Sequence, residues 1–149
     1  MLSREDFATL VRLGPLVSMD LIVHDAAGRV LVGKRSNEPA REFWFVPGGS
    51  IKKGERLAEA FGRITVAELG EPMPIERAEF RGVYEHFYET NFTRAGGFGT
   101  HYVVLAYDLR LTRRLTQLPT DQHEGYRWLT PGEVLADPMV HENTKAYCR

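Results

Sequence analysis

The stretch that ends at Gly70 constrains the fold of this chain more than any other. An apolar run from Trp44 to Val46 leads through Pro47 to two glycines, Gly48 and Gly49, and then to a segment with apolar residues at helical spacing. A glycine directly after the last helical residue is a common C-terminal stop. The pattern predicts a strand, a glycine turn and a helix over residues 55–69, with Leu57, Phe61 and Ile64 on the core side of the helix.

The polar residues of this helix resemble the Nudix box, Gly-x5-Glu-x7-Arg-Glu-hydrophobic-x-Glu-Glu-x-Gly. Gly49, Glu55, Arg63 and Glu68 fit the pattern, but two carboxylates are missing, because Ile64 and Ala67 stand where the family has glutamates. In an intact box three carboxylates share one helical face and gather hard cations through oxygen ligands. With Glu68 alone, the site should hold fewer ions and need not perform the attack on phosphorus that is usual in the family.

Size and composition set broad bounds. A chain of 149 residues is expected to form one domain over 1–149,. A net charge of -1 leaves no basic surplus for nucleic acid, and the single cysteine, Cys148, excludes an internal disulfide and fits a reducing compartment,. The charged N-terminal residues do not read as a signal peptide, and no apolar run approaches the roughly 18 residues of a membrane span. We therefore expect a cytoplasmic protein with no membrane partner.

Local signals predict the other elements of the chain. Ser3 caps a short helix, and Thr130 opens another with a capping box,. Strands are expected at 17–24, 30–34, 43–46, 79–89, 100–111 and 125–129, with a turn at 25–28, loops at 36–42 and 94–99, and helix over the last ten residues. The expected fold class is α+β, a mixed β-sheet sandwiched between α-helices.

Segments along nearly the whole chain are similar to the GDP-mannose mannosyl hydrolase family of the Nudix superfamily. The similar segments are 4–9, 15–18, 33–35, 44–49, 67–70, 100–104, 122–123 and 126–129, and the similarity includes both departures from the box. The resemblance implies a Nudix fold, hydrolysis of the glycosidic bond of GDP-mannose or GDP-glucose to GDP and free sugar, one Mg²⁺ per subunit, and a homodimer.

The resemblance also implies a ligand set for the metal. By position, Mg²⁺ would be held by the backbone carbonyl of Gly48, by Glu68 and by Gln122. All three donate oxygen, as Mg²⁺ prefers. From the incomplete box alone, Glu68 could equally be a solvated helix carboxylate.

His123 is the expected general base. Attack of water on the anomeric carbon makes GDP the leaving group, so the diphosphate must be neutralised and a base supplied on the opposite face. An imidazole that titrates near neutrality can take the proton of the water. Taken alone, a loop histidine beside Gln122 would more often be merely exposed, and the family context favours the catalytic role.

Four further residues are candidates for catalysis and substrate binding. Arg35 follows an apolar strand and could neutralise phosphate with a bidentate fork, or be an ordinary strand-end charge. Asp20 lies inside an apolar strand, where it must pair with a neighbour such as an arginine or touch sugar hydroxyls. His86 and Tyr102 would face the sugar or the diphosphate, or be half-buried sheet residues.

Several neighbouring features leave alternatives open. Arg63 is interpreted as orienting the carboxylates of the metal site, with Glu55 as a possible partner. Ser50 departs from the narrower family, which has an arginine there that helps the leaving group. Arg35 or a nearby lysine must therefore neutralise more of the charge on the leaving group. The glycine-rich loop 94–99 could be a lid or a plain hairpin connection. The aromatic residues Tyr84, Phe87, Tyr88 and Phe92 could form core or dimer surface, or stack on guanine.

Three classes of function remain at the level of sequence. The favoured class is a glycosyl hydrolase acting on a small-molecule sugar nucleotide. The alternative is a Nudix pyrophosphatase that cleaves a nucleoside diphosphate derivative at phosphorus, which would need the carboxylates absent at Ile64 and Ala67. The third is a nucleotide-binding sensor without catalysis, and the joint presence of Glu68, Gln122 and His123 argues against it.

Overall fold

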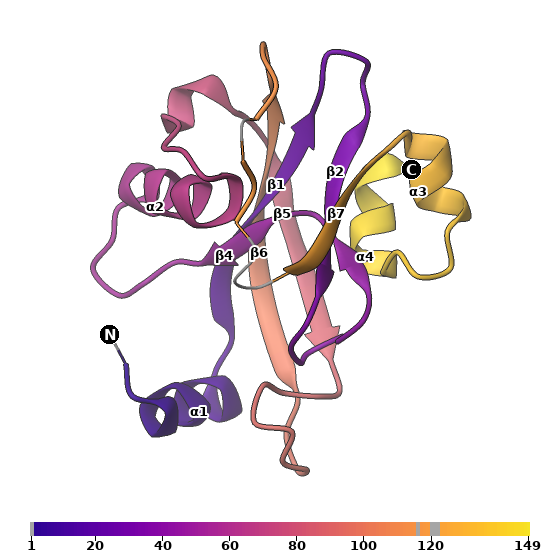
Figure 1. Ribbon diagram of the computed structural model, residues 1–149. Coiled ribbons are helices and arrows are strands. Elements are labelled where there is room, and N and C mark those ends of the chain that lie inside the picture. Colours follow the sequence, from indigo (N-terminus) through magenta and orange to yellow (C-terminus); the bar gives the residue numbers. More distant parts are fainter. Residues whose placement is uncertain (1, 116, 120–122) are drawn as a thin grey trace.

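A mixed sheet between two helical layers forms the fold (Figure 1). The computed structural model describes residues 2–115, 117–119 and 123–149. Within these residues the sheet has seven strands in the order β3-β2-β1-β6-β5, with β4 paired to β1 and β7 paired to β2. Strands β1 and β6 run parallel, whereas the other pairs are antiparallel. The expected α+β sandwich is confirmed.

The bounds of the elements follow the sequence signals closely. The strands are β1 Leu16–His24, β2 Val30–Arg35, β3 Trp44–Phe45, β4 Gly48–Ser50, β5 Glu79–Tyr88, β6 Thr100–Arg110 and β7 His123–Leu129. The α-helices are α1 Arg4–Leu13, α2 Leu57–Leu69, α3 Pro131–Ala136 and α4 Glu142–Lys145, and the 3-10 helices are η1 Ile75–Arg77 and η2 Ala146–Cys148.

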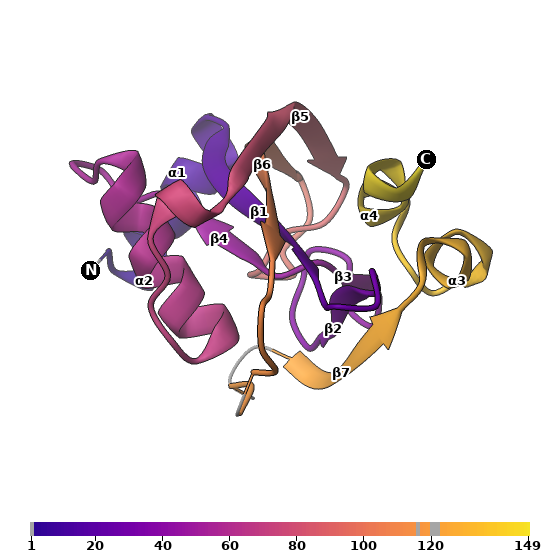
Figure 2. The ribbon, with the colours of Figure 1, turned by 90° about the horizontal axis from the view of Figure 1, so that it is seen from above.

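The two faces of the sheet are covered by different helices. Helix α2 lies on one face, and α3, α4 and η2 lie on the other, as the view from above shows (Figure 2). The core beneath α2 contains Phe61, Ile64 and Leu69 together with the strand residues Met19 and Leu21. Because side chains alternate along a strand, Ile22 points to the opposite face. There it packs with Ala106 and Tyr147.

The caps that the sequence predicts are present. The hydroxyl of Ser3 accepts a hydrogen bond from the backbone N–H of Asp6, and Thr130 forms a capping box with Glu133. Gly70 ends α2 in the left-handed region, at φ 86°. This backbone conformation strains any residue that has a Cβ, which explains why the helix stops at a glycine.

Five expectations about the elements need correction. Helix α2 begins at Leu57 instead of Glu55, and Leu57, which was expected on the core side, is 46% exposed at the first position of the helix. Gly48–Ser50 is strand β4 and not only a turn, since it pairs with β1. Strand β7 begins at His123, two residues earlier than expected, and the predicted strand at 43–46 is reduced to Trp44–Phe45.

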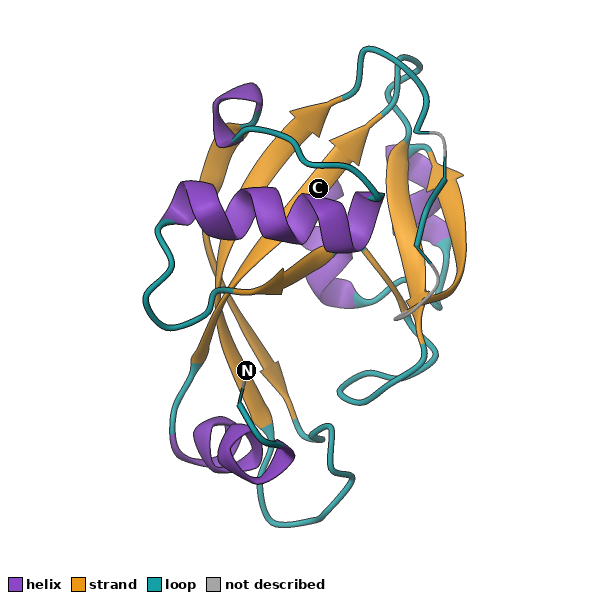
Figure 3. Ribbon diagram, turned by 60° about the vertical axis from the view of Figure 1, so that its left-hand side comes forward, coloured by secondary structure: helices purple, strands orange, loops and turns teal. Residues whose placement is uncertain are grey.

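The glycine-rich loop is fastened at its base. The side-chain amide of Asn91 donates hydrogen bonds to the carbonyls of Ala95 and Phe98, at 2.8 and 2.9 Å. Phe92 packs against Phe7 of α1, which lies beside this loop at the end of the molecule farthest from η1 (Figure 3). These contacts favour the hairpin connection over a lid. Among the described residues, no helix is both long and apolar enough to cross a membrane.

Candidate active site

The glycine turn and helix α2 meet at a buried carboxylate. Glu68 lies in the last turn of α2, is 6% exposed, and accepts a hydrogen bond of 3.0 Å at Oε1 from the backbone N–H of Gly48. A Cβ on Gly48 would lie 2.4 Å from the carbonyl oxygen of Met19 and 2.6 Å from Oδ1 of Asp20. Only glycine therefore fits at this point of β4, and the close approach joins helix, turn and strand β1 in one site.

His123 lies next to Glu68. Its Nε2 is 3.4 Å from Oε1 of Glu68, and its ring is 8% exposed. The other nitrogen, Nδ1, is buried against Gly33 and has no hydrogen-bond partner among the described residues. Contrary to expectation, His123 is not in a loop: it is the first residue of β7 and pairs in register with Arg35 of β2. The sheet therefore fixes the imidazole beside the helix carboxylate.

Arg35 ends strand β2, close enough to Asp20 for its positive charge to lower the pKa of that carboxyl group. The guanidinium carbon lies 5.6 Å from the centre of the Phe45 ring, and Nε is buried without a hydrogen-bond partner in the described part of the chain. An unpaired buried N–H is costly in free energy, and an anionic ligand oxygen would satisfy it. Arg35 is thus placed to bind an anion.

Asp20 is half-buried in the middle of β1, and it forms no ion pair with an arginine among the described residues. Its Oδ2 accepts a hydrogen bond of 2.7 Å from the hydroxyl of Tyr147. Burial raises the pKa of Asp20 to about 7, and the negative charge of Glu68 adds to the rise, while the Tyr147 hydrogen bond and the positive charge of Arg35 oppose it,. Desolvation therefore disfavours the charged form of the Asp20 carboxyl group, and the contacts with Tyr147 and Arg35 favour it,.

His86 and Tyr102 are opposite each other on β5 and β6. Burial, with the nearby His141 as a second cause, lowers the pKa of His86 to about 4, and burial raises the pKa of Tyr102. Both side chains are therefore neutral at pH 7. Neutral hydrogen-bond donors and acceptors suit sugar hydroxyl groups better than phosphate, because phosphate prefers cationic side chains.

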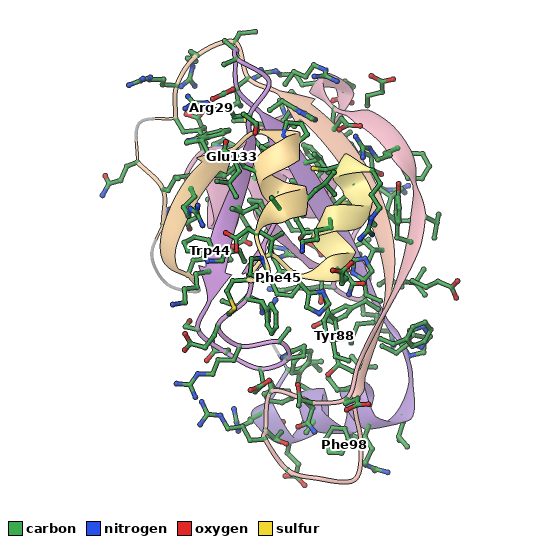
Figure 4. The ribbon with its side chains drawn as sticks, turned by 90° about the vertical axis from the view of Figure 1, so that its right-hand side faces the viewer. Arg29, Trp44, Phe45, Tyr88, Phe98 and Glu133 are labelled. Carbon is green, nitrogen blue, oxygen red and sulfur yellow. The ribbon has the colours of Figure 1, made fainter. Side chains whose placement is uncertain are left out.

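The C-terminal segment contributes site residues that sequence reasoning missed. The ring of His141 stacks on Phe45 at 4.8 Å and lies 5.3 Å from Tyr88, and the side-chain amide of Asn143 donates a hydrogen bond to the hydroxyl of Tyr88. Phe45 and Tyr88 lie close together below the C-terminal helices (Figure 4). The alternation of β5 puts Tyr88 on the face of His86, which was a usable signal. No local pattern pointed to His141 or Tyr147.

Arg63 holds the loop before α2 instead of a metal-site carboxylate. It donates hydrogen bonds to both carboxylate oxygens of Glu55, at 2.8 and 2.9 Å, and to the carbonyl of Ser50 at 2.8 Å. Glu55 is the partner of Arg63 that was considered from the sequence. Its effect is to fasten residues 50–55 against the helix that carries Glu68.

Two of the three expected metal ligands lie in the described part of the chain. Gly48 and Glu68 are adjacent, whereas Gln122 lies outside the described residues. No cluster of three or more His, Cys, Asp or Glu side chains with metal-binding geometry occurs in the described ranges. The carboxylates of Glu68 and Asp20 nevertheless both lie against Gly48, and carboxylate oxygen is a ligand that hard divalent cations prefer,. The donor types fit a magnesium ion.

Fold and site together define the class of protein: a mixed sheet between two helical layers, with a helix carboxylate held under a glycine turn. The NUDIX domain model matches residues 14–149. The low-salt glycan biosynthesis protein Agl8 of Haloferax volcanii is 38% identical over 136 residues, which are 91% of this chain and 84% of that protein. The chain belongs to the Nudix family and is an enzyme of the Nudix hydrolase type, a group that generally uses a divalent metal.

Solved structures share the fold. The MutT NUDIX hydrolase from Burkholderia pseudomallei superposes with a TM-score of 0.69 at 24% identity, covering 91% of this chain and 96% of that chain. The NUDIX domain of NrtR from Shewanella oneidensis, which was crystallised with ADP ribose, superposes with a TM-score of 0.63 at 18% identity, covering 93% and 90%. At these identities the likeness is one of fold.

Proposed function

We propose that the protein hydrolyses the glycosidic bond of GDP-mannose, and also that of GDP-glucose, and releases GDP and the free sugar. The observation that carries the proposal is the 3.4 Å approach of His123 to Glu68 at the end of a helix that lacks the other carboxylates of the box. Ile64 stands at one of those positions and packs into the core under Gly49. One carboxylate with an imidazole suits attack of water on carbon, with a diphosphate as leaving group.

One relative lends support to a sugar-nucleotide substrate. The name of Agl8 refers to glycan biosynthesis, a process for which sugar nucleotides are general donors. That name agrees with a substrate in which a diphosphate links a nucleoside to a sugar.

Three residues would hold one Mg²⁺ per subunit: Gly48 through its carbonyl, Glu68 and Gln122. When bound, the ion supplies Lewis-acid neutralisation of the departing diphosphate. Arg35 adds a fixed positive charge for the same phosphates, because its buried Nε lacks a partner among the described residues,. This charge matters more here because Ser50 is neutral at the position where the narrower family has an arginine.

His123 would act as general base. Nε2 is the nitrogen turned toward Glu68, whereas Nδ1 is enclosed by Gly33, so Nε2 would take the proton of the attacking water,. Asp20, His86 and Tyr102 would bind the sugar hydroxyls and orient the anomeric carbon. Because water attacks opposite the leaving group in one displacement, the product anomer would be inverted.

A product assay tests this function directly. The protein is incubated with Mg²⁺ and GDP-mannose, GDP-glucose, UDP-glucose or ADP-ribose, and the products are separated by ion-exchange chromatography. We expect GDP and free sugar from the first two. GMP together with a sugar 1-phosphate would contradict the proposal and establish the pyrophosphatase alternative, and binding without turnover would establish the sensor.

The proposal includes the homodimer that the family resemblance implies. Strand β5 is the outermost strand of the sheet on its side, and its residues Val83 and Phe87 are exposed. A second copy would remove this apolar surface from water. Light scattering in solution should give twice the mass of 16.9 kDa, and the mass of a single chain would contradict the dimer.

A further inference from the structure

The C-terminal 3-10 helix η2 brings a buried tyrosine to the site. Tyr147 is 4% exposed and packs on the sheet face opposite α2, where its ring meets Tyr84 edge-on at 4.8 Å. His86 lies 6.4 Å away between ring centres. Tyr147 therefore stands among the residues assigned to the sugar side of the site, although it is separated from all of them along the chain.

The two oxygens of the Asp20 carboxylate have different neighbours, and one of them is the hydroxyl of Tyr147. Oδ2 accepts the Tyr147 hydrogen bond at 2.7 Å, while Oδ1 points toward Gly48, since a Cβ built there would lie 2.6 Å from it. Burial and the charge of Asp20 raise the pKa of Tyr147, so the hydroxyl keeps its proton and remains the donor. One carboxylate oxygen is thus occupied by the hydroxyl, and the other lies beside Gly48.

The backbone of Tyr147 is fixed as well. Its carbonyl accepts a hydrogen bond of 2.5 Å from Nη1 of Arg81, and Arg81 in turn holds both carboxylate oxygens of Asp108 at 2.9 and 3.0 Å. His24 contacts the same Asp108 at 2.7 Å. This network ties η2 to strands β1, β5 and β6, so the tyrosine is held at its carbonyl and at its hydroxyl.

We propose that Tyr147 is a positioning residue of the active site: it holds Asp20 so that Oδ1 faces the substrate beside Gly48. The inference deepens the proposed function and rests on it for the role of Asp20 in binding the sugar. It makes the C-terminal segment part of the site and not only a cover for the sheet. A hydrogen bond to a charged group, when it orients a reacting complex, is worth about 10- to 100-fold in rate.

The test uses Tyr147→Phe, which keeps the ring and the Arg81 contact and removes only the hydroxyl. We expect kcat for GDP-mannose to fall about 10- to 100-fold with a smaller change in KM. In an Asp20→Asn background the same change should have no further effect on kcat, because the two residues act as one unit. Tyr107→Phe, a buried tyrosine on the α2 side of the sheet, is the matched control and should leave kcat unchanged.

Three results would overturn the inference. These are an unchanged kcat in Tyr147→Phe, a full additional loss in the Asp20→Asn background, and a crystal structure of Tyr147→Phe in which Asp20 keeps its orientation. The crystal structure needs no substrate, so it decides the positioning role even where the wild-type protein releases no GDP from any sugar nucleotide. In that case the proposed function fails on its own measurement.

Discussion

At the scale of single residues, the proposed chemistry depends on one carboxylate and one imidazole. Glu68 already accepts a hydrogen bond from Gly48, and His123 contacts the same oxygen at 3.4 Å. That distance is at the long limit for a hydrogen bond, so the imidazole lies near the carboxylate but is bound to it only weakly. Such a pair leaves the carboxylate free to bind a cation and the imidazole free to accept a proton.

Glu68→Gln should weaken metal binding and preserve the fold. The amide oxygen can still accept the hydrogen bond from Gly48, but it carries no charge for a divalent ion. Substitution of a residue that only orients a metal ligand lowers metal affinity roughly 10- to 100-fold. Substitution of a ligand itself should lower the affinity at least as much. Titration of activity with Mg²⁺ and calorimetric titration of the free protein measure the shift. An unchanged metal dependence, with several essential ions per site, would refute the single-ion account.

His123→Gln should lower kcat by about 10²–10⁴-fold with little change in KM, because general-base catalysis typically contributes that much to the chemical step. The matched control is His101→Gln, whose ring stacks on the exposed Phe87 on the other face of β5 and β6. Steady-state kinetics with GDP-mannose compares the two variants. Should both retain near-normal kcat, the base is another group, and His86 becomes the next candidate.

At the scale of elements, the loop before α2 is held by charge. The hydrogen bonds from Arg63, and then that from the backbone N–H of Lys52, lower the pKa of Glu55 from 4.5 to about 2. A carboxylate whose pKa is lowered on folding stabilises the folded state above its unfolded pKa. That stabilisation is lost as the pH falls through the folded pKa.

Glu55→Gln should therefore be less stable than the wild type at pH 6, and the difference should disappear as the pH falls from about 4.5 to 2,. Urea unfolding at several pH values measures the free energies. The control is Glu79→Gln, which makes the same side-chain change at the exposed start of β5. A gap between Glu55→Gln and the wild type that persists at pH 2 would show that the carboxylate acts through shape and not through charge.

The elements that could be predicted are those with local signals. Ser3, Gly70 and Thr130 each mark a helix end through contacts a few residues away, and the sequence located all three,. Strand β4 could not be predicted in the same way, because glycines favour turns and its strand character comes from pairing with β1,. The contact of Tyr147 with Asp20 spans 127 residues and leaves no local pattern.

The candidate site was predictable only as separate residues. Glu68 matched the spacing of the box, whereas Gly48 was expected as a ligand only through the family resemblance. The approach of His123 to Glu68 depends on pairing of β7 with β2 far along the chain, which single-sequence patterns do not encode. Ligation by Gln122 stays a prediction, since this residue lies outside the described ranges.

At the scale of the whole molecule, the two faces of the sheet carry different kinds of residues. The face under α2 is an apolar core, and the opposite face carries Asp20, His86, Tyr102 and Tyr147. Glu68 and His123 stand where the last turn of α2 meets the end of β2. In the proposed function, a diphosphate bound near Glu68 and Arg35 would extend its sugar toward the polar face.

The central claim is that water attacks carbon and not phosphorus, and isotope labelling tests it most directly. GDP-mannose is hydrolysed in ¹⁸O-enriched water, and the products are examined by mass spectrometry and by proton NMR before mutarotation. The account predicts that the label enters the sugar, that GDP is unlabelled, and that an α-linked substrate first gives the β anomer. Label in a phosphate group, with GMP as the primary product, would contradict it.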